Sequence, residues 1–209
     1  MAQLKIGLID YGAGNLRSVG KALELIGFQV KLTEDYHDLA DIDGIVFPGQ
    51  GVAGPAMGRL DGSGLTTFLK EKVEEGVPFF GVCLGLQLLF DHSDEGNTNC
   101  LGILPGDNLK FTDQLKVPHM GWNNVGLVKE HPAFKDIPKD FEFYFVHSYY
   151  ANPSNTDHIV GETSYGIKFP SVVAYNNLIA TQFHPEKSSR TGVSLYENFF
   201  ISAKEGKLT

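Results

Sequence analysis

Cysteine and long apolar runs are scarce in this 209-residue chain. Its two cysteines, Cys83 and Cys100, are too few for a disulfide scaffold in a chain of this length, which predicts a reducing, cytoplasmic setting. The most apolar stretch covers only residues 77–90 and contains Gln87, so it is too short to cross a bilayer. The segment before Asp10 is too short for the apolar core of a signal peptide. We therefore expect no membrane partner.

Positive charge is also in short supply. The chain has 17 Lys and Arg against 25 Asp and Glu, which gives a formal net charge of −8. Nucleic-acid binding depends on Lys and Arg side chains that neutralise phosphates, and no basic block offsets the acidic total. We therefore expect no nucleic-acid partner. Because the composition shows neither a linker nor a repeat, one domain over residues 1–209 is the expected organisation.

The first half of the chain alternates between two hydrophobic patterns. Strand patterns occupy residues 4–10, 28–32, 44–47 and 77–82, and helical patterns occupy residues 16–26, 65–73 and 84–89. Alternating strands and helices predict a parallel sheet flanked by helices, with ligands at the carboxyl ends of its strands.

The second half has short β-rich runs instead. They lie at residues 141–146, 172–175 and 178–183, and a closing helix is predicted at 193–203. Asn176-Asn177 suits a hairpin turn between two of these runs. The predicted fold class is therefore α/β: an open, mostly parallel central sheet flanked by helices, with an antiparallel β extension in the second half.

The stretch GVCLG places Cys83 between Gly81 and Gly85, where a predicted strand meets a predicted helix. This pattern is typical of a nucleophile elbow, a sharp turn whose close contacts exclude large side chains. Such a turn is expected to expose the sulfur at the sheet edge and to place it at a helix N-terminus, which favours the thiolate. The alternative is a buried, inert cysteine.

A base for this cysteine is predicted in FHPE. His184 follows an apolar run, and in extended backbone Glu186 points to the same side as His184. Nucleophile, base and an orienting carboxylate form a catalytic triad. The other six histidines lack such a partner in a comparable context, so we expect them to be surface or capping residues.

The loop PGQG ends another predicted strand. Adjacent strand ends would bring this loop beside Cys83, where the backbone N–H groups of Gln50, Gly51 and Leu84 would form an oxyanion hole. Together, PGQG, GVCLG with Gln87, and FHPE resemble the class I (triad) glutamine amidotransferases. The resemblance implies that Cys83 attacks the glutamine amide, that ammonia leaves, and that the thioester is hydrolysed to glutamate. It implies neither a cofactor nor a metal. The residues it implies for substrate binding are Gly49, Gly51, Gln87, Ser148 and Tyr149.

Further stretches narrow the resemblance within that family. PHMGWN at 118–123, YFVHSY at 144–149 and DYGAGNL at 10–16 are similar to the glutaminase subunits of imidazole glycerol phosphate synthase, which act in histidine biosynthesis. This implies a heterodimer with a (βα)8-barrel cyclase subunit that consumes the ammonia. The implied interface residues are Asn15, Ser18, Pro118, Met120, Trp122, Tyr144 and Lys187. Without the family, core packing is an equal alternative for Trp122, the single tryptophan.

Gln50 departs from the family pattern, which usually has an apolar residue at this point of the loop. In this family the peptide group of that residue must reorient to complete the oxyanion hole when the partner carries its ligand. With Gln50 at this position, the sequence does not determine how the reorientation is controlled. It also leaves open a paralogue that supplies ammonia to a different synthase, for example in sugar amination. The remaining alternatives are a non-catalytic scaffold and a general thiol hydrolase or peptidase.

Overall fold

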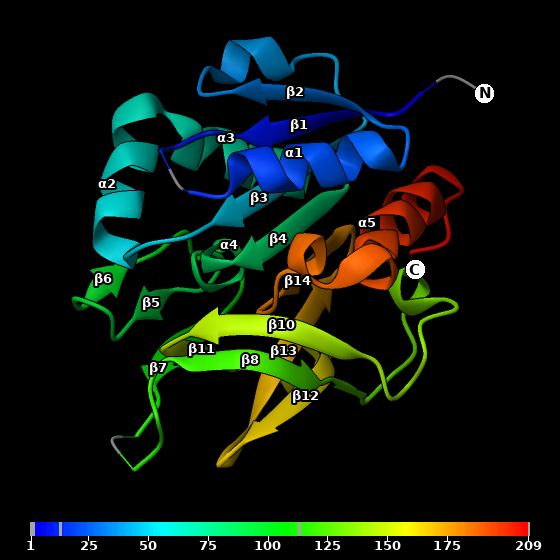
Figure 1. Cartoon of the computed structure of the whole chain (residues 1–209). Coiled ribbons are helices and arrows are strands. Elements are labelled where there is room, and N and C mark those ends of the chain that lie inside the picture. The colour runs from blue at the N-terminus through cyan, green and yellow to red at the C-terminus, as the bar shows by residue number, and fades with distance from the viewer. Residues whose placement is uncertain (1–2, 13, 113, 209) are drawn as a thin grey trace.

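The computed structural model describes residues 3–12, 14–112 and 114–208; residue 13, within the stretch 10–16 singled out above, lies outside them. An eight-stranded sheet in the order β2-β1-β3-β4-β14-β13-β12-β9 forms its centre (Figure 1). The strands β2, β1, β3, β4 and β14 are mutually parallel, whereas β13, β12 and β9 continue the sheet with antiparallel pairing. The predicted fold class is confirmed.

The elements of the first half follow the predicted alternation. They are β1 (Lys5–Ile9), α1 (Leu16–Leu25), β2 (Gln29–Thr33), the 3-10 turn η1 (Tyr36–Leu39), β3 (Gly44–Gly49), α2 (Ala53–Ser63), α3 (Leu65–Glu74), β4 (Phe79–Cys83) and α4 (Leu84–Gln87). Helix α4 is shorter than the predicted helix over 84–89. Helix α2 was not predicted, because glycine and proline weaken the helical signal of its sequence AGPAMGRLDGS.

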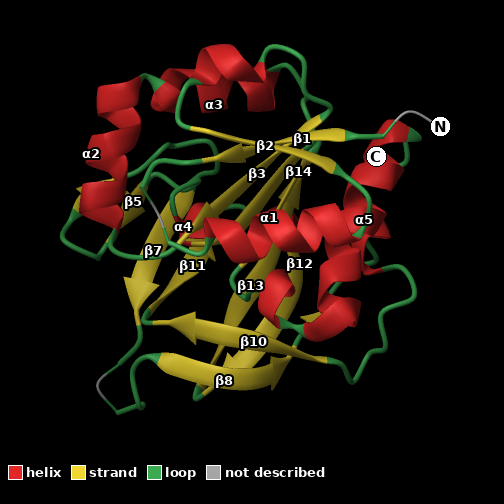
Figure 2. Ribbon diagram, turned by 45° about the horizontal axis from the view of Figure 1, so that its top comes forward, coloured by secondary structure: helices red, strands yellow, loops and turns green. Residues whose placement is uncertain are grey.

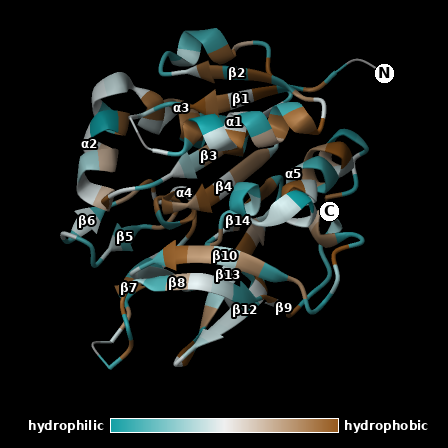
Figure 3. Cartoon of the chain, viewed as in Figure 1, coloured by the Kyte–Doolittle hydropathy of each residue, from teal (hydrophilic) through white to brown (hydrophobic). Residues whose placement is uncertain are grey.

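Helices cover both faces of the sheet (Figure 2). Successive strand residues point to opposite faces, so Val46 joins the core beneath α1 and α5 while Phe47 joins the core beneath α2 and α3. The strands β1 and β4 are coloured as strongly hydrophobic in Figure 3, as strands covered on both faces should be. Within the described residues, every helix falls short of the length and hydropathy that a membrane crossing requires.

The second half is richer in strands than predicted. It contains β5 (His92–Ser93), β6 (Thr98–Asn99), β7 (Gly106–Lys110), β8 (His119–Asn124), β9 (Gly126–Leu127), η2 (Pro132–Phe134), β10 (Glu142–His147), β11 (Tyr149–Pro153), η3 (Thr156–His158), β12 (Ile159–Tyr165), β13 (Ile167–Tyr175), β14 (Leu178–Thr181), η4 (Pro185–Lys187) and α5 (Ser189–Lys204). The hairpin turn at Asn176-Asn177 is confirmed, since Tyr175 pairs with Leu178.

Two smaller sheets were not predicted. One is the β8–β10 ribbon, and the other has the order β11-β7-β5-β6. The ribbon packs against η4 and β12, and the backbone N–H of His184 donates to the carbonyl of Tyr144 on β10 at 2.9 Å. Strand β10 therefore lies against the carboxyl end of the central sheet, which is where the predicted site residues gather.

Candidate active site

Cys83 occupies a strained turn between β4 and α4. Its backbone angles, φ 55° and ψ −110°, lie in a region that residues other than glycine rarely adopt. Such strain at a strand-to-helix turn is the geometry of a nucleophile elbow. The conformation is held by the parallel pairing of β4, in which Cys83 stands opposite Gly49 of β3.

Two glycines permit this close approach. A Cβ on Gly85 would lie 1.9 Å from the carbonyl oxygen of Phe47. A Cβ on Gly49 would lie 2.4 Å from the Tyr11 hydroxyl and 2.7 Å from Cβ of Leu84. The end of β3 and the start of α4 therefore approach each other too closely for a side chain at either glycine.

Replacing Gly85 with alanine is expected to destabilise the protein by about 3 kcal/mol, because the methyl group would overlap a backbone oxygen that cannot move without breaking the β3–β4 pairing. Urea unfolding measures the effect. Gly58→Ala in α2 is the matched control, since a Cβ at Gly58 meets nothing within 4 Å and alanine there should raise stability by up to about 1 kcal/mol. Equal stability of the two variants would contradict the proposed contact.

The sulfur of Cys83 is not exposed at the sheet edge as predicted; the residue is only 6% exposed. The second half of the chain covers it. The sulfur lies 3.9 Å from the carbonyl oxygen of Val146 on β10 and 3.7 Å from the amide nitrogen of Gln182. The thiol therefore belongs to a buried apolar cluster but has two polar groups beside its sulfur.

His184 and Glu186 make the predicted contact, but from a different backbone conformation than the predicted extended one. Nδ1–H of His184 donates to Oε1 of Glu186 at 2.8 Å. The two residues do not share an extended strand, because β14 ends at Thr181 and Pro185 begins the 3-10 turn η4. The Glu186 carboxylate also accepts hydrogen bonds from the hydroxyl of Tyr196 at 3.2 Å and from the side chain of Asn15.

The electrostatics of this group favour a charged imidazole. Burial lowers the pKa of His184, but interactions with Cys83 and then with Glu186 outweigh burial and raise that pKa to about 10. Nε2 of His184 is buried, and no atom of the described residues is in hydrogen-bond geometry with it. A proton on Nε2 is therefore free for Cys83 or a substrate.

Gln87 lies on the same side of the site and is almost fully buried, at 5% exposure. Its amide nitrogen donates to the carbonyl oxygen of Tyr149 at 2.8 Å and to Oε1 of Gln182 at 3.1 Å. Because both N–H groups are used, Oε1 of Gln87 is the atom left to accept from a ligand. Ser148 is half-buried between β10 and β11, and its carbonyl accepts from the backbone of Phe111.

Gln182 is a site residue that sequence reasoning missed. It is fully buried, and its amide lies between Gln87 and the sulfur of Cys83. The sequence does contain a signal for it: an amide side chain stands within the apolar run before His184. A buried amide needs hydrogen-bond partners, so its presence there indicates a polar site nearby.

The predicted oxyanion-hole residues lie together. Gln50 and Gly51 directly follow Gly49, which pairs with Cys83, and Leu84 is the next residue along the elbow. The Tyr11 hydroxyl, close to Gly49, is buried without a hydrogen-bond partner among the described residues; burial, and then the charge of Cys83, raise the pKa of Tyr11. The Gln50 side chain extends toward Gly14 in the loop after β1.

Three of the predicted interface residues, Trp122, Tyr144 and Lys187, lie next to one another. Trp122 is 52% exposed, so the core-packing alternative for it is wrong. Its ring contacts Tyr144 edge-on, with centroids 5.9 Å apart, and Nζ of Lys187 lies 5.7 Å from the Tyr144 ring centroid. The remaining members are half-buried or exposed: Asn15, Ser18, Pro118 and Met120. Asn15 donates to Glu186 and so adjoins the triad.

Three of the other six histidines are buried, which corrects the prediction that they are surface or capping residues. They are His119, His147 and His158. His119 and His147 bond to each other at 2.9 Å, which a sequence separation of 28 residues did not reveal. His131 does cap η2, by accepting from the backbone of Ala133.

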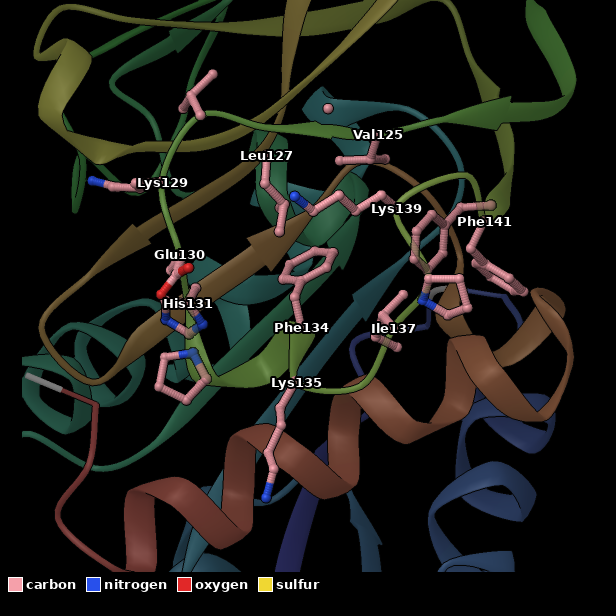
Figure 4. Close-up of a pocket in the computed structure, with 15 residues that line it drawn as sticks. Val125, Leu127, Lys129, Glu130, His131, Phe134, Lys135, Ile137, Lys139 and Phe141 are labelled. Carbon is pink, nitrogen blue, oxygen red and sulfur yellow. The ribbon is translucent and has the colours of Figure 1, made fainter.

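A cavity lies elsewhere on the molecule, and none of the predicted site residues lines it. It has a volume of about 840 Å³ and lies between β9, η2 and the loop that leads to β10. Figure 4 shows apolar side chains such as Leu127 and Phe134 in it, with Lys129, Lys135 and Lys139 around them. In the part of the chain that the structure describes, His, Cys, Asp and Glu side chains form no group that would hold a metal ion.

The chain is similar in sequence to known proteins along almost its whole length. The family model "Glutamine amidotransferase class-I" matches residues 7–203. The imidazole glycerol phosphate synthase subunit HisH of Methanocaldococcus jannaschii is 49% identical over 195 residues, which cover 93% of this chain and 97% of that protein. The subunit of the same name from Dehalococcoides mccartyi strain 195 is 46% identical over 199 residues, with coverages of 95% and 97%.

Solved structures resemble the fold at lower identity. A crystal structure described as a glutamine amidotransferase has a TM-score of 0.76 and 19% identity, covering 95% of this chain and 98% of that one. A PurLQS structure from Thermotoga maritima has a TM-score of 0.75 and 15% identity, with coverages of 96% and 99%. These likenesses concern the fold alone.

Proposed function

This chain belongs to the class I glutamine amidotransferase family, and on that premise we propose that it hydrolyses glutamine with Cys83, His184 and Glu186 and supplies the ammonia to a (βα)8-barrel cyclase. The whole chain, residues 1–209, would act as one domain. A reducing cytoplasm would keep its catalytic thiol active, in line with two cysteines that form no disulfide.

The observation that carries this proposal is the convergence of the triad. The Nδ1–Oε1 contact of 2.8 Å supports Glu186 as the carboxylate that orients His184. The interaction of His184 with Cys83 supports a thiolate–imidazolium pair, in which Cys83 is the nucleophile and His184 moves the protons.

The reaction follows from these positions. The sulfur of Cys83 forms a bond to the amide carbon of glutamine, and the resulting oxyanion is stabilised by backbone N–H groups of Gln50, Gly51 and Leu84. His184 gives its proton to the leaving nitrogen, the C–N bond breaks, and ammonia departs from the thioester. Water then attacks the thioester, His184 takes a proton from that water, and glutamate leaves as the Cys83 sulfur is released. Gln87, Ser148, Tyr149, Gly49 and Gly51 would hold the substrate.

The proposed partner is the cyclase subunit of imidazole glycerol phosphate synthase, in a heterodimer that serves histidine biosynthesis. Relatives at 46% and 49% identity are named as subunits of that synthase. The aromatic face around Trp122 and Tyr144 supports docking, because exposed Trp and Met side chains are enriched at interfaces. Docking also has a chemical purpose: ammonia released into water is mostly protonated, and ammonium is no longer a nucleophile.

The testing experiment measures glutamine hydrolysis with and without the candidate cyclase and its nucleotide ligand. We expect low activity from this chain alone and much higher activity in the liganded complex. Absence of both binding and stimulation would overturn the proposed partner. Stimulation by a different synthase would instead favour the paralogue suggested by Gln50.

Trp122→Ala is expected to weaken cyclase binding by about 2 kcal/mol or more, because exposed tryptophans at interface centres dominate binding energy. Titration calorimetry measures this change. Leu25→Ala is the matched control: Leu25 is 85% exposed but lies at the end of α1 remote from Asn15, so binding should not change. Similar affinities of the two variants would refute a docking face centred on Trp122.

A further inference from the structure

A pair of buried histidines connects two strands beside the site. His119 on β8 and His147 on β10 stand opposite each other in the antiparallel ladder. Nδ1 of His119 lies 2.9 Å from Nε2 of His147, and the two residues are 3% and 6% exposed. The ring of His119 is also stacked between Phe145 and Tyr165. Neither histidine belongs to the triad or to the residues implied for substrate binding.

The neighbours of this pair determine where its protons lie. Nδ1 of His147 is 2.8 Å from the carbonyl oxygen of Tyr149, which only accepts, so that nitrogen carries the proton. Nε2 of a neutral His147 then accepts, and Nδ1 of His119 must donate to it. Nε2 of His119 is in turn left to accept from the side-chain amide of Asn123 at 3.3 Å. The hydrogen bonds run in one direction, from Asn123 to the Tyr149 carbonyl.

The neutral state of both rings is consistent with their surroundings. Burial lowers the pKa of His147 to about 3 and that of His119 to about 4. A proton added to either ring would place two N–H donors against each other. Both histidines therefore stay neutral while His184, nearby, is charged.

We call this series of hydrogen bonds, Asn123–His119–His147–Tyr149, the relay. Its last acceptor, the Tyr149 carbonyl, also holds the side chain of Gln87. The carbonyl of Tyr149 accepts from Nδ1 of His147 and from the Gln87 amide at 2.8 Å. That amide also donates to Gln182, whose own amide faces the sulfur of Cys83. A fixed Tyr149 carbonyl therefore fixes which atom of Gln87 faces the substrate.

The other end of the relay lies on β8. Side chains alternate along this strand: His119 points inward, whereas Met120 and Trp122 are exposed at 62% and 52%. The same strand thus supports the proposed docking face on one side and the relay on the other.

We propose that His119 and His147 are positioning residues for glutamine hydrolysis, which hold the Tyr149 carbonyl and, through it, the Gln87 amide in the orientation that receives glutamine. This inference rests on the proposed glutaminase function. It adds a role for two residues that make no contact with the reacting atoms. Losing the relay should impair recognition of glutamine while leaving the chemistry of the Cys83 thiol intact.

The test compares His119→Phe with His119→Asn. Phenylalanine keeps the ring stacked on Phe145 and Tyr165 but cannot donate to His147, whereas the asparagine amide nitrogen can replace Nδ1–H. His158→Phe removes another buried imidazole outside the relay and serves as the matched control. Each protein, in complex with the cyclase, is reacted with a glutamine-analogue electrophile, which needs the substrate pocket, and with iodoacetamide, which does not. Thermal unfolding of each variant is recorded alongside.

For His119→Phe we expect the glutamine analogue to label Cys83 about tenfold more slowly, which is the effect expected from the loss of one hydrogen bond. The rate of labelling by iodoacetamide should not change. His119→Asn and His158→Phe should label like the wild type. An unchanged analogue rate in His119→Phe overturns the inference. So does an equal loss in His119→Asn, or a loss that both reagents share.

A second measurement, by NMR spectroscopy, tests the relay independently of the proposed glutaminase function. Histidine ¹⁵N spectra at neutral pH should show both relay rings neutral with the proton on Nδ1, the tautomer that free histidine disfavours. Nε2–H tautomers would overturn the relay. If the wild type resists the glutamine analogue but reacts with iodoacetamide, the glutaminase proposal fails, and the ¹⁵N spectra still decide the relay.

Discussion

Replacing Cys83 with alanine is expected to reduce glutamine hydrolysis by about 10⁴-fold or more, since loss of a triad nucleophile removes the covalent route entirely. The fold should survive, because alanine is small and the strained turn belongs to the backbone. The measurement is glutamate release by this chain in complex with its cyclase. Circular dichroism verifies that the variant is folded.

Cys100→Ala is the matched control and should keep wild-type activity. Burial, and then the charge of Glu95, raise the pKa of the Cys100 thiol to about 11, so it is a weak nucleophile at neutral pH. A glutamine-analogue electrophile should therefore label Cys83 alone. An active Cys83→Ala variant would contradict the triad, and an unlabelled wild type in the presence of the partner would favour the non-catalytic scaffold. Turnover of peptide or ester substrates without a partner would favour the general thiol hydrolase.

His184→Gln is expected to lower the rate by about 10³-fold, because a positioned acid–base group contributes roughly 10²–10⁴ and the Cys83 thiolate also loses its counter-charge. Single-turnover hydrolysis of glutamine in the complex measures this loss. The control is His131→Gln. It removes a histidine that caps η2 and that is distant in sequence from the proposed triad. Equal rates for the two variants would mean that His184 moves no proton in the reaction.

The same substitution tests the charge of His184. Because interactions with Cys83 and Glu186 outweigh burial and raise the pKa to about 10, protonated His184 stabilises the fold fully below the ordinary histidine pKa of about 6.5, and this contribution is lost as the pH rises through about 10. Urea unfolding at pH 7 and at pH 10 should therefore show a larger decrease for the wild type than for His184→Gln. An identical decrease would indicate that His184 is neutral at pH 7.

The proposed triad joins elements that are distant in the chain. Cys83 comes from the end of β4, whereas His184 and Glu186 follow β14, and these two strands are parallel neighbours in the sheet. Strand β10, from between them in sequence, then covers the sulfur. The site therefore needs both halves of the chain, and neither half would form it alone.

Much of this arrangement was readable from the order of the amino acids. The apolar runs before PGQG, GVCLG and FHPE predicted strand ends, and parallel strands bring their carboxyl ends to one edge. The glycines around Cys83 predicted a turn with no room for side chains. In the structure, a Cβ at Gly85 would overlap the carbonyl oxygen of Phe47. These signals are local, because they depend on residues adjacent in sequence, and so they needed no knowledge of the whole fold.

Other features depended on which segments meet in space. The burial of Cys83 requires β10 to lie against the sheet edge. The His119–His147 contact requires β8 to pair with β10, and the position of Gln182 beside Cys83 requires β14 to pair with β4. No periodicity within these strands specifies their partners. The predicted route from His184 to Glu186 was wrong for the same reason: the pattern was compatible with a strand, but Pro185 begins a 3-10 turn. Short-range pattern thus indicated the strands, the elbow and the residues of the proposed triad. Only tertiary packing decided what surrounds the sulfur, because hydrogen bonds between distant segments form where the fold brings those segments together.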